Sequence, residues 1–155
     1  MLDFQALAEA KADARQINDK VQQRFIETYD SAVSQVMALH QLSCEAPERR
    51  LPERLLRQAV DTLAKAIDLK PSAAQPYALY SCLFFLMEDL PRARKYLQTA
   101  RELNPGFPKI AALEALYNDF EALEALHQQL PADAAPTPPR IKPLETFDDF
   151  QLADI

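Results

Sequence analysis

Two cysteines and two histidines are the residues of this 155-residue chain best suited to nucleophilic or metal chemistry. Cys44 and Cys82 lie far apart in the sequence, and His40 and His127 have no evident nucleophile or metal partner. A structural zinc site needs four such ligands, usually in closely spaced pairs. We therefore expect no metal site, two reduced thiols, and surface roles for both histidines near helix ends.

Phosphate binding and acid–base catalysis also lack the residues they need. The chain holds a single glycine, Gly106, so it cannot form a glycine-rich phosphate loop. The adjacent carboxylates Asp148 and Asp149 fall in a segment that we expect to be flexible, whereas general acid–base catalysis requires fixed geometry. We predict a protein that is not an enzyme, with no catalytic residues and no cofactor.

The composition points to one all-helical domain. Hydrophobic residues make up 48% of the chain, with one glycine and no tryptophan, a profile that suits helices rich in alanine and leucine. The net charge of −6 disfavours nucleic acid and anionic membranes as partners and favours a cationic or mixed protein surface. Because no secretory signal and no run of about 18 apolar residues is present, we expect a cytoplasmic protein without membrane insertion.

Hydrophobic periodicity and helix-boundary residues predict five helices. The first covers residues 4–43, which contain no proline or glycine, and its first half is expected to overhang the core. The others are expected at 53–69, 73–88, 90–103 and 109–130. Ser72 with Gln75 forms a candidate capping box for the third helix, and Asp89 is a candidate cap for the fourth.

A proline-rich segment divides the chain into a domain and a tail. Residues 1–130 are expected to form the helical domain, while 131–143 contain five prolines and read as an extended tether. Residues 144–155 then combine aromatic, aliphatic and acidic side chains, a composition typical of a short docking motif. The residues of this predicted tail docking motif are Leu144, Phe147, Asp148, Asp149, Phe150, Leu152 and Ile155.

An internal repeat with a period of 34 residues is visible when the chain is aligned with itself. The aligned pairs are Ala59 with Ala93, Leu63 with Leu97, Ala66 with Ala100, Leu69 with Leu103, and Pro71 with Pro105. This alternation of small and large residues, closed by proline, resembles the tetratricopeptide repeat. The resemblance covers residues 52–105 well and 107–130 loosely, and Ser81 stands where the family prefers glycine.

The resemblance implies a stack of antiparallel helix hairpins with a concave partner-binding groove. By that resemblance the groove would be lined by Gln75, Ala78, Cys82, Phe85 and Leu86. The Lys and Asn with which some family members hold a terminal carboxylate are absent, since Ala78 and Cys82 occupy those places. An apolar groove of this kind suits an amphipathic helix or a hydrophobic peptide. Equally, Phe85 and Leu86 could be buried against the long first helix.

The most favoured function is a protein–protein interaction adaptor or scaffold that uses the groove and the tail motif to join a protein or peptide partner. One alternative is a secretion or assembly chaperone of the tetratricopeptide type. Another is a coiled-coil structural subunit in which residues 4–43 form a homodimer, although the apolar stripe follows a 3.6-residue period better than a strict heptad. The tail, for its part, could bind another protein or fold back into the groove of its own chain.

Overall fold

The computed structural model describes residues 3–129 of the chain. The predicted tether at 131–143 and the whole tail docking motif at 144–155 lie outside the described residues, as does the boundary at residue 130. Residues 3–129 form five helices and no strand, so the prediction of an all-helical fold is confirmed.

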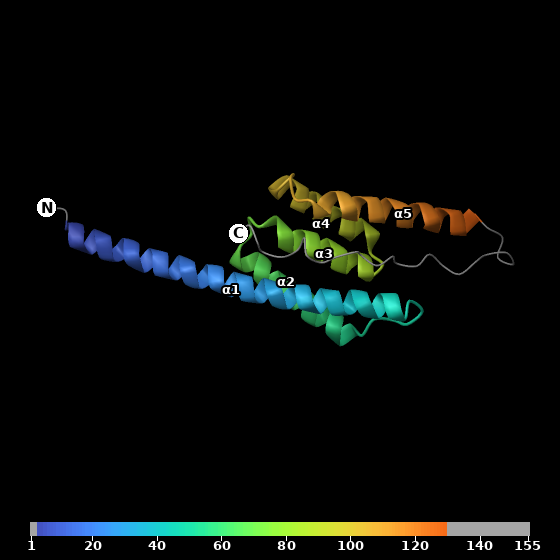
Figure 1. The fold of residues 1–155 in the computed structure, drawn as a ribbon, viewed down its shortest axis with the longest axis horizontal. Coiled ribbons are helices and arrows are strands. Elements are labelled where there is room, and N and C mark those ends of the chain that lie inside the picture. The colour runs from blue at the N-terminus through green and yellow to red at the C-terminus, as the bar shows by residue number, and fades with distance from the viewer. Residues whose placement is uncertain (1–2, 130–155) are drawn as a thin grey trace.

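The first helix, α1 (Phe4–Glu45), extends far beyond the rest of the fold (Figure 1). Asp3 caps it by accepting hydrogen bonds from the backbone N–H groups of Gln5 and Ala6 at 3.1 and 3.4 Å. Side chains from Asp3 to Val21 are all exposed, and Phe25 is the first buried residue of the helix. The expected overhang is therefore present, and only the second half of α1 contributes to the core.

The remaining helices are α2 (Glu53–Leu69), α3 (Ala74–Leu86), α4 (Leu90–Leu103) and α5 (Lys109–Gln129). Consecutive helices contact one another, and α3 also contacts α1 and α5. In Figure 1, α3 lies between the α1–α2 pair and the α4–α5 pair. The core lies where these helices meet, and its largest fully buried side chains are Phe25, Tyr29, Val36, Leu39, Leu63, Leu79, Leu83, Leu113 and Tyr117.

Most helix boundaries agree with the residues that predicted them. α2 ends at Leu69, before Lys70-Pro71, and α4 ends at Leu103, before Asn104-Pro105. Asp89 caps α4 by accepting a hydrogen bond from the Arg92 backbone N–H at 3.2 Å. A residue that precedes proline is disfavoured in the helical region, so each helix stops there.

The predicted capping box at Ser72 is wrong. α3 begins at Ala74 with Ala73 as its N-cap, and no side chain caps it. The Ala73 backbone N–H instead donates to the Lys70 carbonyl at 3.2 Å, which closes a tight turn and leaves Ser72 exposed in that turn. The buried Ala73 and Ala74 decide where the helix starts, because they pack into the core.

The turn between α3 and α4 contains a residue in the left-handed backbone region. Glu88 has a φ of 61°, and the Asp89 backbone N–H donates to the Phe84 carbonyl at 2.9 Å. This reversal ends α3 at Leu86, two residues earlier than predicted. A non-glycine residue at positive φ has a steric cost, since its Cβ approaches the backbone carbonyl.

Replacing Glu88 by glycine should stabilise the protein. Glu88→Gly removes the left-handed penalty, and we expect the free energy of unfolding to rise by about 1 kcal/mol in urea denaturation. Met87→Gly is the matched control, because Met87 has a φ of −84° and should lose stability through added chain entropy. Equal effects of the two glycines would show that the backbone angle at Glu88 carries no strain.

Candidate functional site

The middle helix, α3, positions the predicted groove. Its sequence is apolar almost throughout, and ten of its side chains are buried because all four other helices contact it. The three half-buried exceptions are Gln75, Tyr77 and Tyr80. A partner surface on α3 must therefore be shared with the helices that pack on it.

The structure places four of the five predicted groove residues in the interior. Ala78, Cys82, Phe85 and Leu86 are each less than 5% exposed, and Gln75 is half-buried. They recur at three- and four-residue intervals, so they follow one side of α3. The helix that packs on this side is α5. The ring centroid of Phe85 lies 4.9 Å from that of Tyr117 and 5.2 Å from that of Phe120, both on α5.

A separate aromatic cluster packs the side of α3 that faces α4. Tyr80 lies edge-on to Phe84 and to Tyr96, with ring centroids 4.8 and 4.7 Å apart, and Phe84 stacks on Tyr96 at 5.2 Å. The Arg92 guanidinium covers the Phe84 ring at 5.7 Å. These contacts fix α4 on α3, whereas the predicted groove residues lie on the side of α3 that packs on α5.

Ser81 joins three helices through its hydroxyl. It is fully buried, its Oγ donates to the Ala93 carbonyl of α4 at 2.5 Å, and it lies 2.7 Å from the Tyr117 hydroxyl of α5. Burial raises the pKa of Tyr117 well above its usual value, so the phenol stays protonated. Serine here is thus a polar link between helices, a role that the sequence comparison with glycine did not predict.

One side of α5 continues this surface. Lys109, Leu116, Phe120, Leu123 and His127 recur at helical spacing, and Phe120 places that stripe against Phe85. Lys109 is 4% exposed and is the only lysine or arginine among residues 3–129 that is buried. Its positive charge lies close enough to Cys82 to oppose the effect of burial, which raises the pKa of that thiol to about 12.

A pocket of about 320 Å³ lies at the far end of the same surface. It is lined by Phe85, Glu88, Leu90, Phe120, Glu124, His127 and Gln128. Its floor is apolar and its rim carries two carboxylates. The α3–α5 contact therefore has the buried Lys109 near the start of α5 and an acidic pocket rim near the end of α5.

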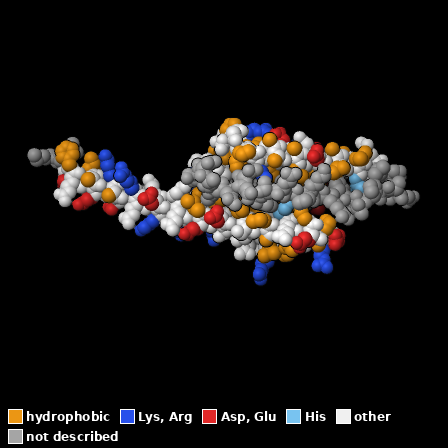
Figure 2. All heavy atoms as spheres, in the orientation of Figure 1, with side chains coloured by type: hydrophobic (Ala, Val, Ile, Leu, Met, Phe, Trp, Pro, Cys, Tyr) orange, Lys and Arg blue, Asp and Glu red, His pale blue; other side chains and the backbone are white. Residues whose placement is uncertain are grey.

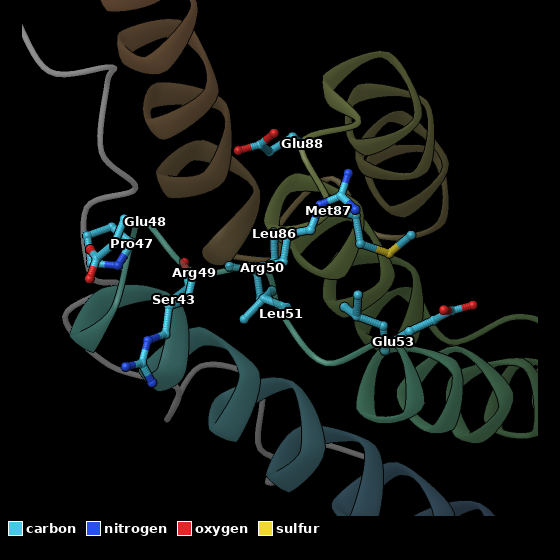
Figure 3. Close-up of a pocket in the computed structure, with 11 residues that line it drawn as sticks. Ser43, Pro47, Glu48, Arg49, Arg50, Leu51, Glu53, Leu86, Met87 and Glu88 are labelled. Carbon is cyan, nitrogen blue, oxygen red and sulfur yellow. The ribbon is translucent and has the colours of Figure 1, made fainter.

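A second pocket, of about 520 Å³, was not predicted (Figure 3). The loop between α1 and α2 forms one wall with Pro47, Glu48, Arg49, Arg50 and Leu51. The last residue of α3, Leu86, and the turn residues Met87 and Glu88 form the other wall. The only hint in the sequence was the length of the loop between Glu45 and Glu53. Its rim mixes both charge signs, so it favours no ligand class.

The histidines and cysteines do not form a reactive pair. His40 is 5% exposed, which corrects the expected surface position, and its Nε2 lies 3.6 Å from Cys44 Sγ. Burial lowers the pKa of His40 and raises that of Cys44, so the neutral forms of both are favoured. A thiolate nucleophile needs the opposite shifts. Within residues 3–129, no three His, Cys, Asp or Glu side chains lie together in a way that could hold a metal ion.

The two thiols should differ sharply in reactivity. Cys82 is buried with a pKa near 12, whereas Cys44 is partly exposed, so Cys82 should react with iodoacetamide more than tenfold more slowly in the native protein. Mass spectrometry of tryptic peptides measures both rates. In urea the two rates should converge, and equal rates in the native state would contradict the burial of Cys82.

Comparison with protein-family models, with curated proteins and with solved structures found no match for the chain. None of the five helices within residues 3–129 combines the length and apolar character needed to cross a membrane. A functional argument therefore has to come from the repeat, the groove and the exposed surfaces of the chain itself.

Proposed function

We propose that this protein is a non-enzymatic interaction adaptor of the tetratricopeptide-repeat type, which binds a protein or peptide partner in the groove between α3 and α5. The tail docking motif at residues 144–155 would supply a second contact. Three properties of the described residues support the proposal: repetition in burial, repetition in backbone geometry, and the order in which the helices pack.

Burial repeats with the 34-residue period, and this observation carries the proposal. Ala59 and Ala93, Leu63 and Leu97, and Ala66 and Ala100 are all between 0 and 4% exposed. In the family these small residues allow close helix approach, and the large one fills the gap between them. An accidental sequence periodicity would not be expected to bury both members of these three pairs, although the pairs Leu69–Leu103 and Pro71–Pro105 lie outside the core.

The backbone repeats in the same register. Lys70 ends α2 with φ −146° and ψ 80°, and Asn104 ends α4 with φ −149° and ψ 91°. Three residues later, the N–H groups of Ala73 and Phe107 donate to the carbonyls of Lys70 and Asn104, each at 3.2 Å. The two helix ends and the turns after them are thus alike.

The start of α5 extends the repetition to a third unit. The buried α3 residues Pro76, Leu79 and Leu83 correspond, at the same offset, to the buried α5 residues Ile110, Leu113 and Tyr117. In addition, α3 contacts both α1 and α5, as the first helices of successive hairpins would. These facts support a reading in which α1, α3 and α5 line one face of the stack.

The adaptor proposal is tested by charging the α5 side of the groove. Full-length Leu116→Glu/Leu123→Glu and a matched control, Ala122→Glu, are compared with the wild type in affinity purification. Leu116 and Leu123 follow the Phe120 stripe, whereas Ala122 is exposed on the opposite side of α5. We expect the double variant to recover at least tenfold less of a partner than the wild type does, and the control to recover as much as the wild type.

The folding of each variant is checked by circular dichroism before partner recovery is compared. Partners that bind the double variant as strongly as the wild type would refute the groove as the binding surface. Recovery of partners only as co-expressed, otherwise insoluble clients would instead indicate the chaperone alternative.

A second candidate function is dimerisation through the projecting half of α1. Phe4 is 78%, Leu7 50% and Ile17 62% exposed, so apolar side chains on this arm have no partner among residues 3–129. Figure 2 shows that the arm also carries interspersed acidic and basic side chains. Sedimentation at micromolar concentration tests this role. A wild-type dimer that becomes a monomer on Ile17→Asp substitution would support it, and a wild-type monomer would exclude it.

A further inference from the structure

The projecting half of α1 carries an apolar seam that the other described residues leave exposed (Figure 1). Its residues are Leu7, Ala10, Ala14, Ile17 and Val21. They recur at alternating intervals of three and four, so Leu7, Ala14 and Val21 take position a of a heptad, and Ala10 and Ile17 take position d. The stripe of α1 as a whole departs from a heptad because Val21, Phe25 and Tyr29 follow at intervals of four. The heptad is thus confined to the part of α1 that lies outside the core.

The order of large and small residues along this seam favours antiparallel pairing with a second copy of the chain. In a parallel pair each seam residue meets itself, so Ala10 and Ala14 would face only alanines and leave gaps in the seam. In an antiparallel pair position a meets position d, so that Ala14 faces Ile17 of the second copy and Ala10 faces Val21. A small residue then meets a large one in each central layer, which permits close packing without voids.

The charges that flank the seam select the same direction. Position e holds Phe4, Lys11 and Asn18, and position g holds Ala6, Asp13 and Lys20. When Ala14 faces Ile17, position g faces position g, and Asp13 of each copy lies opposite Lys20 of the other. Two-fold symmetry forms this ion pair twice. In a parallel pair position g faces position e of the next heptad, where Asp13 meets Asn18 and Lys20 meets Phe25, so no opposite charges pair.

The charges also fix the alignment of the two arms. A shift by one heptad in one direction places Asp13 opposite Asp13 and Lys11 opposite Lys11, and a shift in the other direction places Lys20 opposite Lys20. Like charges in such positions weaken association. In the favoured alignment Lys11 faces Asn18, and Leu7 faces Arg24, whose aliphatic stem can cover it.

The other charges of the arm do not compete for Asp13 and Lys20. On their own helix, the charged neighbours at three or four residues are Glu9 for Asp13 and Arg24 for Lys20, which carry like charges. Neither Asp13 nor Lys20 forms an ion pair within residues 3–129. Three charged residues of the arm occupy the outward positions c, b and f: Glu9, Arg15 and Asp19. The remaining acidic residue, Asp3, caps the helix.

We propose that two copies of the chain pair antiparallel through residues 7–24 of α1, with Asp13 of each copy beside Lys20 of the other. This inference rests on the second candidate function, dimerisation through the arm, and adds its direction and alignment. It does not depend on the groove between α3 and α5. The two helical bodies lie at opposite ends of the paired arms, so one dimer carries two grooves.

The test is sedimentation velocity of full-length proteins from about 1 to 100 µM, a range in which a short seam rich in alanine should dimerise reversibly. Asp13→Lys and Lys20→Asp each place like charges at both flanking contacts, so each should weaken the dimer at least tenfold. An equimolar mixture of these two variants should dimerise within about threefold of the wild type, because the mixed dimer restores both ion pairs. Asp19→Lys and Arg15→Asp are the matched controls, since they change the net charge equally at outward positions and should alter the dissociation constant less than about threefold.

A wild type that stays monomeric up to about 100 µM would overturn both this inference and dimerisation as a function. A wild-type dimer that Asp13→Lys and Lys20→Asp leave intact, or a mixture of the two that stays monomeric, would overturn the antiparallel alignment alone. Equal weakening by the controls would overturn it too, because net charge would then explain the effect. Circular dichroism checks that every variant keeps the helix content of the wild type.

Discussion

Leu63→Ala and Leu97→Ala should each lower the free energy of unfolding by about 2 to 5 kcal/mol. The two leucines are 0% and 4% exposed, and each stands between two fully buried alanines of its helix. Truncation removes buried methyl groups and leaves a cavity, because the flanking alanines have no side chain long enough to fill it. Urea denaturation followed by circular dichroism measures both losses, and the denaturant slope should stay unchanged if both states remain as compact.

If positions 34 residues apart are equivalent, Leu63→Ala and Leu97→Ala should lower the free energy of unfolding by similar amounts. Leu103→Ala is the matched control, because Leu103 is 40% exposed and should lose less than about 0.5 kcal/mol. A large loss at Leu63 with none at Leu97 would show that positions 34 residues apart are not equivalent in energy. The stacked-hairpin proposal would then lose its main support.

Prolines and polar caps made most helix boundaries predictable from the sequence. Proline acts locally: Pro71 and Pro105 disfavour helix in the residue before them, and Pro91 fits the first turn of α4 after Asp89. These effects need no knowledge of distant contacts. The number of helices and the ends of α2 and α4 follow from these effects.

The errors arose where tertiary contacts outweigh local preference. Ser72 has the side chain of a good cap, yet the burial of Ala73 and Ala74 sets the start of α3. His40 looks like a surface residue near a helix end, yet the packing of α1 buries it. Neither outcome can be derived from the residue type and its immediate neighbours.

The candidate site was predictable only in part. The resemblance grouped Ala78, Cys82 and Phe85 on one side of α3, but it gave no indication of what faces them. Lys109 sits beside Cys82, and Phe120 beside Phe85, because α5 folds back over α3. The pocket between the α1–α2 loop and Met87 likewise depends on two segments whose proximity the sequence does not encode locally.

The tetratricopeptide repeat that we propose for this chain would have glycine in place of Ser81. Glycine would allow close helix packing there, and a larger residue would be expected to loosen it. Here the hydroxyl accommodates the approach by bonding to the Ala93 carbonyl and to the Tyr117 hydroxyl, so α3, α4 and α5 share one polar contact. The tyrosine at position 117 and the serine at 81 therefore depend on each other.

This dependence predicts a strong coupling between the two residues. Ser81→Ala should destabilise the protein by about 1 to 3 kcal/mol, because it leaves the buried Tyr117 hydroxyl without its hydrogen-bond partner. Ser81→Ala/Tyr117→Phe should recover at least about 1 kcal/mol relative to Ser81→Ala, since the unsatisfied hydroxyl is then gone. A double-mutant cycle from urea denaturation measures the coupling, with Thr99→Ala on the surface of α4 as a control that should change stability by less than about 0.5 kcal/mol. Strictly additive losses at Ser81 and Tyr117 would mean that the hydroxyl contact contributes nothing to holding α5 on α3, and the groove between them would then rest on aromatic packing by Phe85 alone.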